Sequence, residues 1–330
     1  MNTFGRLFQV SIFGASHGEI IGVDVEGCPP GLPLAPEDFS LDLKRRQPGK
    51  TGTTTRIELD APLIKCGILN GKTTGAPLLI LFENKDIRSQ DYDHIKKYPR
   101  PGHVDFVANR KYGGFADHRG GGRFSGRVTI GMVAAGVIAK KLLRPASIDA
   151  TIIEVGGNWN LQQEIEKVIE EKDSVGGLIE CSAKNLPVGL GEPFFDSAES
   201  LISHWVFSIP GIKAIEFGTG FLAARMKGSE YNDVIIDTSG KTRTNHSGGI
   251  NGGITNGNDL VFRVAVRPPA SIGKEQETID IETGQPARIE AKGRHDVCIA
   301  LRMPVIIEAA VACALADLAM LAQLIKRILH

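Results

Sequence analysis

The N-terminal third of the chain alternates apolar and polar positions in short runs, which is the pattern of β-strands with one buried face. Residues 7–13 and 21–27 alternate in this way and flank the loop GASHGEI. Residues 36–48 begin with a proline and acidic side chains and end with basic ones, as expected of a helix that complements its own dipole. Further strands are expected at 56–60, 62–69 and 77–83.

The rest of the chain is organised around two long apolar segments, 128–143 and 304–327, which we predict to be helices. Glu308 and Asp317 lie within the second segment, so a helix buried in the protein core is favoured over a membrane span. Between these segments the pattern predicts a strand at 148–155, a helix at 160–171, a strand at 178–185, a helix at 196–207, and strands at 212–217, 233–237 and 259–267.

The order of these elements favours an α+β fold over a wound parallel sheet. Antiparallel connections outnumber the helical crossovers that parallel strands need, so we expect sheets that pack on helices. Both halves of the chain share a rough order of strands, a helix and glycine loops, so residues 1–330 are expected to form one domain with two roughly similar halves. Residues 84–125 are polar and rich in glycine, proline and charge, and a connection of this length is expected to be functional.

Charge and cysteine content narrow the classes of function. The 38 basic and 38 acidic residues cancel and aromatic residues make up only 6% of the chain, so we expect neither nucleic acid nor a membrane as a partner. The five cysteines are scattered without a C-x-x-C pair, so neither a disulfide framework nor a metal site is expected. With no signal peptide apparent at the N-terminus, the cysteine pattern indicates the reducing cytoplasm.

Residues 117–129, DHRGGGRFSGRVT, are the strongest chemical signal in the chain. Three consecutive glycines free the backbone to turn tightly and to approach a ligand closely. Arg119, Arg123 and Arg127 add positive charge, and the helix expected after them would present unpaired N–H groups and the positive end of its dipole. These features predict an anion site, and phosphate is the anion we expect. A surface loop with a solvated charge cluster is the alternative interpretation.

Histidines in other glycine-framed loops are candidates for proton transfer. His17 lies between Gly14 and Gly18, His103 lies in RPGHVD, and His295 precedes Asp296 in GRHDVC. Histidine titrates near neutrality, so a proton-transfer site would use it, although a single loop histidine is more often structural. Arginines that grip phosphate or carboxylate could converge on the same site, or could each be ordinary surface residues: Arg46, Arg123, Arg267 and Arg294.

Two further segments resemble motifs of other protein classes, and a third is open to two interpretations. GTGFLA at 218–223, followed about twenty residues later by Asp237, imitates a dinucleotide fingerprint and leaves a nicotinamide-dependent dehydrogenase as an alternative. GASHG matches the nucleophile elbow of hydrolases, but that elbow leads into a helix, whereas a strand is expected here. The glycine-rich segment 244–257 fits either a loop that wraps a ligand or a hairpin of turns.

Taken in order, many segments resemble those of the chorismate synthase family, and the resemblance covers nearly the whole chain. The matching segments are GASHG, GCPPGLPL, RRQPG, GKTTGAP, NKDIRSQDY, RPGHVD, KYGG, DHRGGGRFSGR, DSVGG, GLGEPFFD, EFGTGF, NHSGGINGGITNG and GRHDVCIALRMPVIIEA. The resemblance implies two antiparallel β-sheets that sandwich a layer of α-helices, assembled as a homotetramer. It implies a lyase that converts 5-enolpyruvylshikimate 3-phosphate to chorismate and phosphate by anti 1,4-elimination, the last common step of the shikimate pathway to aromatic compounds. The family needs reduced FMN although the net reaction is redox-neutral.

The resemblance also implies roles for individual residues. His17 would protonate the departing phosphate, His103 would donate a proton near the flavin, and Asp296 would accept a proton from the flavin late in the cycle. Arg46 matches an arginine that the family associates with NADPH or a substrate anion, and the second such arginine would fall near Thr51, where this chain has none. Contacts to FMN carry over to Arg123, Phe124, Ser125, Pro210, Gly211, Gly252, Arg267, Pro268, Pro269, Ala270, Ser271 and Arg294.

Several positions depart from the family pattern, which reads GESHG, GRSSARET, KPTPS and RHDPC. Phe124 replaces a hydroxyl group that would contact flavin, and Val128 removes a carboxylate from the start of the helix, which makes the anion site more positive. A flavin-binding relative that has lost the lyase activity is therefore an alternative. Reduced flavin would come from NADPH bound by this protein or from a separate flavin reductase. The other departures are Ala15, Gly126, Arg267, Pro269 and Val297.

Overall fold

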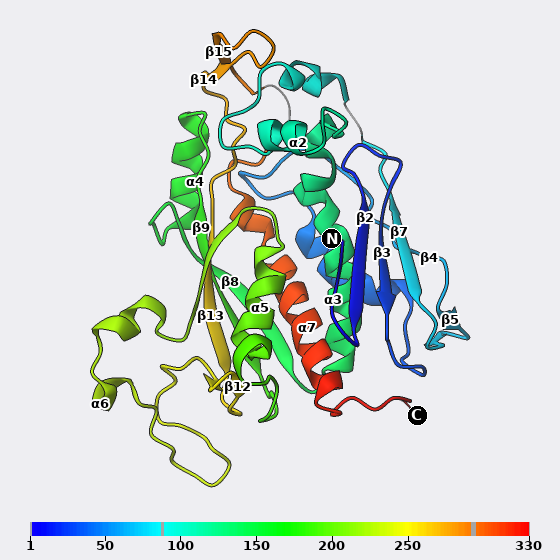
Figure 1. Ribbon diagram of the computed structural model, residues 1–330, viewed down its shortest axis with the longest axis vertical. Coiled ribbons are helices and arrows are strands. Elements are labelled where there is room, and N and C mark those ends of the chain that lie inside the picture. The colour runs from blue at the N-terminus through cyan, green and yellow to red at the C-terminus, as the bar shows by residue number, and fades with distance from the viewer. Residues whose placement is uncertain (1, 87–88, 292–294, 330) are drawn as a thin grey trace.

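Two antiparallel β-sheets lie on opposite sides of a layer of α-helices (Figure 1). The computed structural model that shows this arrangement describes residues 2–86, 89–291 and 295–329. In the view of Figure 1 the sheet formed by the N-terminal strands is on the right and the second sheet is on the left. The predicted α+β fold, with two antiparallel sheets around helices, is confirmed.

The first sheet has the strand order β1-β2-β3-β7-β4, and every pair of neighbouring strands is antiparallel. In its centre Val23 pairs with Ile12 on one side and with Ile80 on the other, and Val23 and Ile80 are fully buried. The alternation seen in the sequence therefore turns one face of this sheet toward the helices. Its strands are β1 (Thr3–Phe4), β2 (Gln9–Gly14), β3 (Ile20–Glu26), β7 (Leu78–Glu83) and β4 (Leu63–Ile64).

The second sheet has the strand order β10-β13-β9-β8 and is also antiparallel throughout. Its central strand reads LVFRVAV, and every second residue, from Leu260 to Val266, is buried. This period of two matches the pleat of a strand with one face on the core. The strands are β8 (Ser147–Val155), β9 (Gly177–Lys184), β10 (Ile212–Phe217) and β13 (Leu260–Val266).

Three helices fill the space between the sheets: α3 (Thr129–Leu142) packs on β3, α7 (Pro304–Leu321) packs on β8 and β9, and α5 (Ala198–Phe207) packs on α7 and β10. Helices α3 and α7 approach each other closely where Gly136 faces Ala309, because a Cβ atom at Gly136 would collide with Ala309. Helix α7 is long and apolar enough to cross a membrane, but 83% of it is buried inside the protein. The predicted core helix is confirmed.

The two acidic side chains of α7 are paired inside the protein. Burial raises the pKa of Glu308, but hydrogen bonds from Arg45 at 2.6 Å and Lys140 at 2.8 Å outweigh burial and lower the pKa below its usual value. Asp317 accepts the backbone N–H groups of residues 6–8 at 2.7 to 3.1 Å. A buried carboxylate is tolerated when such partners replace its water.

Shorter elements connect the layers and carry the loops around the site. The helices are α1 (Ser40–Arg46), α2 (Asp105–Lys111), α4 (Leu161–Glu170) and α6 (Gly228–Tyr231). The 3₁₀ helices are η1 (Pro36–Phe39), η2 (Ser89–Lys96), η3 (Arg119–Phe124), η4 (Gly126–Val128), η5 (Phe194–Asp196), η6 (Gly220–Arg225) and η7 (Ile299–Arg302). Three small hairpins pair β5 (Ile68–Leu69) with β6 (Lys72–Thr73), β11 (Ile250–Asn251) with β12 (Ile254–Thr255), and β14 (Gln276–Ile279) with β15 (Pro286–Ile289).

Four details of the predicted secondary structure are wrong. Residues 62–69 form two short strands, β4 and β5, which belong to different sheets, instead of one strand. Residues 56–60 form no strand, because Glu58 and Asp60 turn inward to pair with arginines and side chains, rather than a strand ladder, hold the segment. Residues 233–237 lie in the exposed excursion at the lower left of Figure 1, where a single bridge joins Ile235 to Thr242. The last helix ends at Leu321 instead of 327, and Gln323 beyond it is left-handed, with φ of 59°.

Candidate active site

The glycine loop within 117–129 lies between two of the predicted histidines. A Cβ atom at Gly120 would lie 2.7 Å from Nε2 of His17, and one at Gly121 would lie 3.8 Å from Cε1 of His103. Gly120, Gly121 and Gly122 all have positive φ, from 53° to 79°, which other residues rarely adopt. The three glycines therefore let the backbone pass between both imidazoles, and the two histidines, far apart in sequence, come to one place.

His17 is buried, with 7% of its surface exposed, in the turn between β2 and β3. The amide of Asn84 fixes this turn by donating hydrogen bonds to the carbonyls of Ala15 at 3.1 Å and Gly18 at 2.8 Å. The ring of Tyr92 stands edge-on to the imidazole, with the ring centroids 5.1 Å apart. His17 therefore lies just behind Ser16, Gly120 and Tyr92, which line a cavity.

That surface lines a cavity of about 250 Å³, which we call the polar cavity. Six arginines and three carboxylates line it, which leaves a surplus of three positive charges. Within the part of the chain that the structure describes, no group of three or more metal-ligating side chains could hold a cation. Besides the residues discussed below, its lining includes Pro48, Gly126, Ile299 and Met303; the six arginines are Arg46, Arg56, Arg100, Arg127, Arg267 and Arg302, and the carboxylates are Glu58, Asp60 and Asp296.

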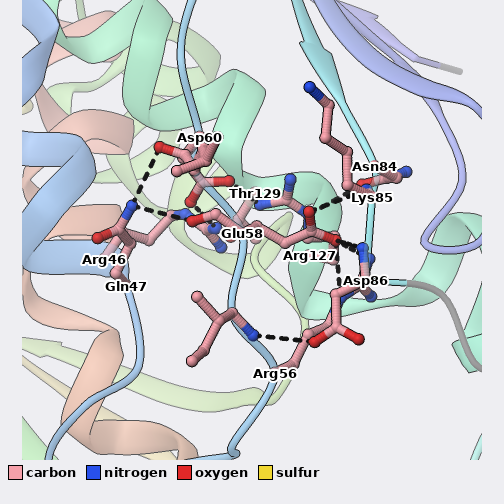
Figure 2. A network of polar contacts seen from close by, with 12 residues as sticks. Arg46, Gln47, Arg56, Glu58, Asp60, Asn84, Lys85, Asp86, Arg127 and Thr129 are labelled. Carbon is pink, nitrogen blue, oxygen red and sulfur yellow. Dashed lines mark hydrogen bonds and ion pairs between the residues drawn. The ribbon is translucent and has the colours of Figure 1, made fainter.

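Asp60 lies between two of the arginines and pairs with both (Figure 2). Its Oδ2 atom accepts a hydrogen bond from Arg46 at 2.9 Å, and its Oδ1 atom pairs with Arg127. Arg127 also donates through Nε to Asn84 at 3.1 Å. The side chains of Arg46 and Asp60 are both only 2% exposed, so these ion pairs are held with little solvent screening.

Two donors of this group lack a hydrogen-bond acceptor among the described residues: Nε of Arg46 and Nη2 of Arg127. Burial lowers the pKa of Arg46 to about 10, against the attraction of Asp60, and the positive charges of Arg302 and Arg127 add to the lowering. Arg46 therefore remains a cation at neutral pH. Unsatisfied buried donors in the wall of a positively charged cavity favour an anionic ligand.

His103 forms a second polar group with Asp105 and Arg100. Its Nδ1 atom lies 2.5 Å from Asp105 Oδ1, and Arg100 donates to both oxygens of Asp105 and to Ser271 Oγ at 2.9 Å. Burial raises the pKa of Asp105, but hydrogen bonds from Arg100 and His103 outweigh it and hold the pKa well below its usual value. Because an ionised carboxylate only accepts hydrogen bonds, Nδ1 carries the proton. Nε2 lies 3.2 Å from Arg100 Nη2 and accepts from it, so this contact must be exchanged before Nε2 takes up a proton.

The charge state of His103 follows from the same environment. Burial lowers its pKa below the usual value, the hydrogen bond to Asp105 opposes this, and the positive charge of Arg100 adds to the lowering. The neutral imidazole is therefore the main form at pH 7, with Nε2 able to accept a proton. For His103 to donate a proton, as the resemblance implies, it must first acquire one.

Asp296 and the preceding His295 both line the polar cavity. Its Oδ1 atom accepts the backbone N–H of Thr54 at 2.9 Å, and its Oδ2 atom lies 3.3 Å from Arg302 Nη1. Arg302 in turn donates through Nε to the carbonyl of Arg46 at 2.9 Å. The carboxylate is thus held by the backbone of Thr54, 242 residues earlier, and by Arg302, six residues later.

Most of the residues predicted to contact flavin meet at this site. Ser125 and Pro210 also line a second cavity of about 770 Å³, which we call the apolar cavity, between β1, β2, α3 and α5. Arg123 lines the apolar cavity, where its guanidinium contacts the side-chain oxygen of Asn2. Shared lining residues make the two cavities direct neighbours. The predicted residues in the polar cavity are Phe124, Ser125, Pro210, Gly211, Arg267, Pro269, Ala270 and Ser271, together with Arg46, His103 and Asp296.

Two predicted flavin contacts stand apart from this group, and the structure does not describe a third. Gly252 lies in the turn of the β11–β12 hairpin, at the end of the molecule away from α2, and lines neither cavity (Figure 1). Pro268 also lines neither of them and lies instead next to Gly176. Arg294 lies outside the described residues. Among the described residues, the predicted flavin contacts other than Gly252 and Pro268 therefore line the two cavities.

The sequence prediction missed several residues of the site. Arg100 is three residues before His103, and its position in RPGH was the only signal for it. Arg127 belonged to the glycine segment but was not assigned to the site. Arg56 carried no sequence signal, whereas Tyr92 and Arg302 lie in the matching segments NKDIRSQDY and GRHDVCIALRMPVIIEA but were given no role.

Two antiparallel sheets around helices, with loops that bring arginines and two histidines to one cavity, define an enzyme that acts on a small, multiply charged anion. A family model described as chorismate synthase matches residues 8–320. The chain therefore belongs to the chorismate synthase family.

Individual relatives agree along the full length. A chorismate synthase of Chitinophaga pinensis is 60% identical over 329 residues, covering 99% of both chains. Chorismate synthases of Korarchaeum cryptofilum and of a Synechocystis species are 43% and 42% identical and each covers about 95% or more of this chain. A crystal structure of a chorismate synthase has a TM-score of 0.75 and 26% identity, covering 97% of this chain and 93% of the other. The resemblance inferred from the sequence is confirmed.

The alternative of a nicotinamide-dependent dehydrogenase is not favoured. Residues 218–223 follow β10 but lead into the 3₁₀ helix η6, and β10 belongs to an antiparallel sheet. The dinucleotide fingerprint needs a parallel βαβ unit with a full helix after the glycines. Gly218 and Gly220 instead form the tight turn at the end of β10, where a Cβ atom at either position would collide with a neighbouring group.

Proposed function

We propose that this chain converts 5-enolpyruvylshikimate 3-phosphate to chorismate and phosphate by anti 1,4-elimination, as a carbon–oxygen lyase of aromatic amino-acid biosynthesis. The observation that carries the proposal is the glycine loop, which lies against His17 and His103 at the edge of a cavity with a surplus of three positive charges. The substrate has one phosphate and two carboxylates, so a cavity lined by arginines suits it. Full-length relatives at 42–60% identity support the same reaction.

His17 is our candidate for the acid that protonates the departing phosphate. Its imidazole is held by the loop at Gly120 and by Tyr92, within the wall that Ser16 and Arg56 complete. A general acid placed where negative charge develops stabilises the transition state most. Elimination of phosphate needs both this proton and cations around the leaving group.

His103 and Asp296 are our candidates for the other proton transfers. The Nδ1–H group of His103 donates a hydrogen bond to Asp105, so Nε2 is the atom that takes up a proton and then donates it near the flavin. Asp296 is held by Thr54 and Arg302 and is our candidate for accepting a proton late in the cycle. When bound, reduced FMN supplies the electron density that lets the phosphate leave.

We propose that FMN binds where the polar and apolar cavities meet. A ligand of this size needs a site of roughly 300–1,000 Å³, and the two cavities offer about 250 and 770 Å³. The lining fits a flavin: Gly211 brings its backbone close to Ile299, since a Cβ atom there would meet Ile299 Cδ1 at 2.7 Å, Arg267 lines the cavity, and the lining around Ser125 mixes polar and apolar groups. Arg294 is included in the proposed FMN site on the resemblance alone.

The position of Gly252 supports a proposal about assembly. This residue lies in open space, with no heavy atom within 4 Å of the Cβ atom it lacks, and away from both cavities. We propose that it contacts the FMN of a neighbouring subunit in a homotetramer. We further propose one domain over residues 1–330 with two roughly similar halves, which the continuous core between the sheets supports, and a location in the cytoplasm.

The supply of reduced flavin has two proposed routes. In the first, NADPH reduces FMN on this protein, and Arg46, which lines the polar cavity, contributes positive charge. In the second, a separate flavin reductase supplies it. Anaerobic assays with FMN and NADPH alone, and then with an added reductase, distinguish the routes.

Phosphate release from 5-enolpyruvylshikimate 3-phosphate, measured anaerobically with dithionite-reduced FMN, tests the proposed function. We expect chorismate and phosphate in equal amounts and no product with oxidised FMN. Titration with oxidised FMN should give a flavin spectral shift at tens of micromolar, a modest affinity, and substrate should tighten it. Flavin binding without phosphate release would instead support a relative that has lost the lyase activity.

A further inference from the structure

Arg56 lies in the wall of the polar cavity beside His17, at a position to which the sequence assigned no function. Its Nη1 atom donates to Ser16 Oγ at 2.9 Å and its Nη2 atom donates to the Ser16 carbonyl at 3.1 Å. Ser16 is the residue before His17 and also lines the cavity. The guanidinium therefore lies directly next to the segment that carries the proposed acid.

Glu58 holds the Arg56 side chain in this orientation (Figure 2). Its Oε1 atom accepts hydrogen bonds from Nε and Nη2 of Arg56 at 3.1 and 2.7 Å. The backbone N–H groups of Lys85 and Asp86 donate to the same carboxylate at 3.0 and 3.3 Å. The Glu58 side chain is 5% exposed and that of Arg56 is 15% exposed, so the guanidinium is held in place before a ligand binds. Arg56 also lines the polar cavity.

Among the residues that the structure describes, the hydrogen bonds of Arg56 leave one donor for a ligand. A guanidinium has five N–H groups, and the four bonds to Ser16 and Glu58 occupy one on Nε, one on Nη1 and two on Nη2. The remaining N–H is on Nη1, the atom that contacts the Ser16 hydroxyl. A fixed cation with one free donor, next to the proposed acid, suits the oxygen of a leaving phosphate.

We propose that Arg56 binds the phosphate group that leaves the substrate and so sets the affinity of the site for phosphate esters. This inference rests on the proposed function and assigns the phosphate to the wall formed by Ser16, His17 and Arg56. It also accounts for a gap in the sequence, since the arginine expected near Thr51 is absent from this chain. Arg56 follows Thr51 by five residues and supplies a cation to the cavity from the same loop.

Arg56→Gln and Arg56→Lys test this assignment, and Arg288→Gln is the matched control. Arg288 pairs with Glu275 on the surface, its side chain is 66% exposed, and it lines neither the polar nor the apolar cavity. Inorganic phosphate serves as the probe in calorimetric titrations of the protein without flavin. The KM for substrate and kcat are measured separately with dithionite-reduced FMN.

We expect Arg56→Gln to raise both the Kd for phosphate and the KM roughly 10- to 100-fold, the loss expected for a hydrogen bond to a charged group. Arg56→Lys should recover part of that loss because it keeps the charge, and Arg288→Gln should change neither constant. A fall in kcat with unchanged KM and unchanged phosphate affinity would show that Arg56 only supports the His17 turn, and the assignment would be wrong. If wild-type protein releases no phosphate from substrate, the proposed function fails, whereas the phosphate titrations still decide the role of Arg56.

Discussion

Gly120 lies directly against His17: the Cβ atom that this glycine lacks would be 2.7 Å from Nε2 and from Cδ2 of the imidazole. The contact joins the glycine loop, which the sequence marks most clearly, to a histidine more than a hundred residues earlier. It also explains why glycine is needed at this position. Both the left-handed backbone, with φ of 58°, and the close approach exclude a side chain.

Gly120→Ala should therefore reduce kcat by roughly 10²-fold, the loss typical of a catalytic group displaced by about 1 Å. Gly114→Ala is the matched control, because Gly114 also has positive φ, 85°, but no heavy atom lies within 4 Å of its missing Cβ. Backbone strain is thus common to both variants, and the collision with His17 is specific to the first. Equal losses of kcat in the two variants would mean that strain, not the contact with His17, matters.

His17→Ala and His103→Ala should each slow turnover by roughly 10²- to 10⁴-fold, the usual contribution of a positioned acid or base. Circular dichroism and thermal unfolding should match the wild type, since each imidazole lies at the edge of the cavity region and not in the apolar core. Steady-state kinetics with reduced FMN measure the effect. Near-normal turnover in either variant would show that the histidine replaced in it has a structural role and takes no part in catalysis.

The titration of His103 should depend on Asp105. Because burial lowers the pKa of His103 in the folded protein, the unfolded chain binds more protons at pH values between the two pKa values. The contribution of His103 to stability is then complete above the unfolded pKa of about 6.5 and is lost as the pH falls through the folded pKa. Asp105→Asn removes the partner that opposes the shift, so the pKa of His103 should fall further.

Nuclear magnetic resonance of labelled imidazole groups measures this change directly. Asp117→Asn is the control, because Asp117 pairs with Arg119 outside the polar cavity and should leave the pKa of His103 unchanged. A pKa of His103 that rises in Asp105→Asn would contradict the hydrogen bond from Nδ1 to Asp105.

Phe124→Ser should retain FMN binding or tighten it up to about tenfold, since a hydroxyl-to-flavin hydrogen bond contributes about 0.5–1.5 kcal/mol. The ring of Phe124 is only half-buried, and its contact with Tyr112 is tilted, with centroids 6.3 Å apart, so little packing is lost. Phe124→Ala removes the same ring without adding a hydroxyl and serves as the control. Weaker FMN binding by both variants, measured by fluorescence titration, would identify Phe124 as an adapted packing residue.

Asp60→Asn should lower the free energy of unfolding by about 3–5 kcal/mol, because it leaves two buried arginines without their shared counter-charge. Asp196→Asn is the matched control. Asp196 pairs with Arg6 on the surface, where the side chains are 28% and 55% exposed, and such pairs contribute roughly 0–1 kcal/mol. Urea unfolding of the two variants measures the two free energies of unfolding. A similar small decrease in both would show that the ion pairs of Asp60 with Arg46 and Arg127 contribute little to stability.

Local patterns were sufficient to predict most of the fold. Strand β13 alternates residue by residue in LVFRVAV, and helix α7 is apolar on every side, so period and hydrophobicity alone identify them. Residues 56–60 alternate in the same way but form no strand, because their inward-facing side chains are carboxylates that pair with arginines. The pattern of one segment does not reveal the partner that lies across the core.

The sequence by itself determined the antiparallel α+β architecture, the glycine loop, the candidate histidines and the family to which the chain belongs, because these depend on short segments and on their order. Only the tertiary structure decided which charges meet. Asp60 joins Arg46 and Arg127, which precede and follow it by 14 and 67 residues, and Arg56 reaches Ser16 across 40 residues. Ion pairs of this kind form between side chains that folding brings together, so their partners are set by the packing of the whole chain and not by any local pattern.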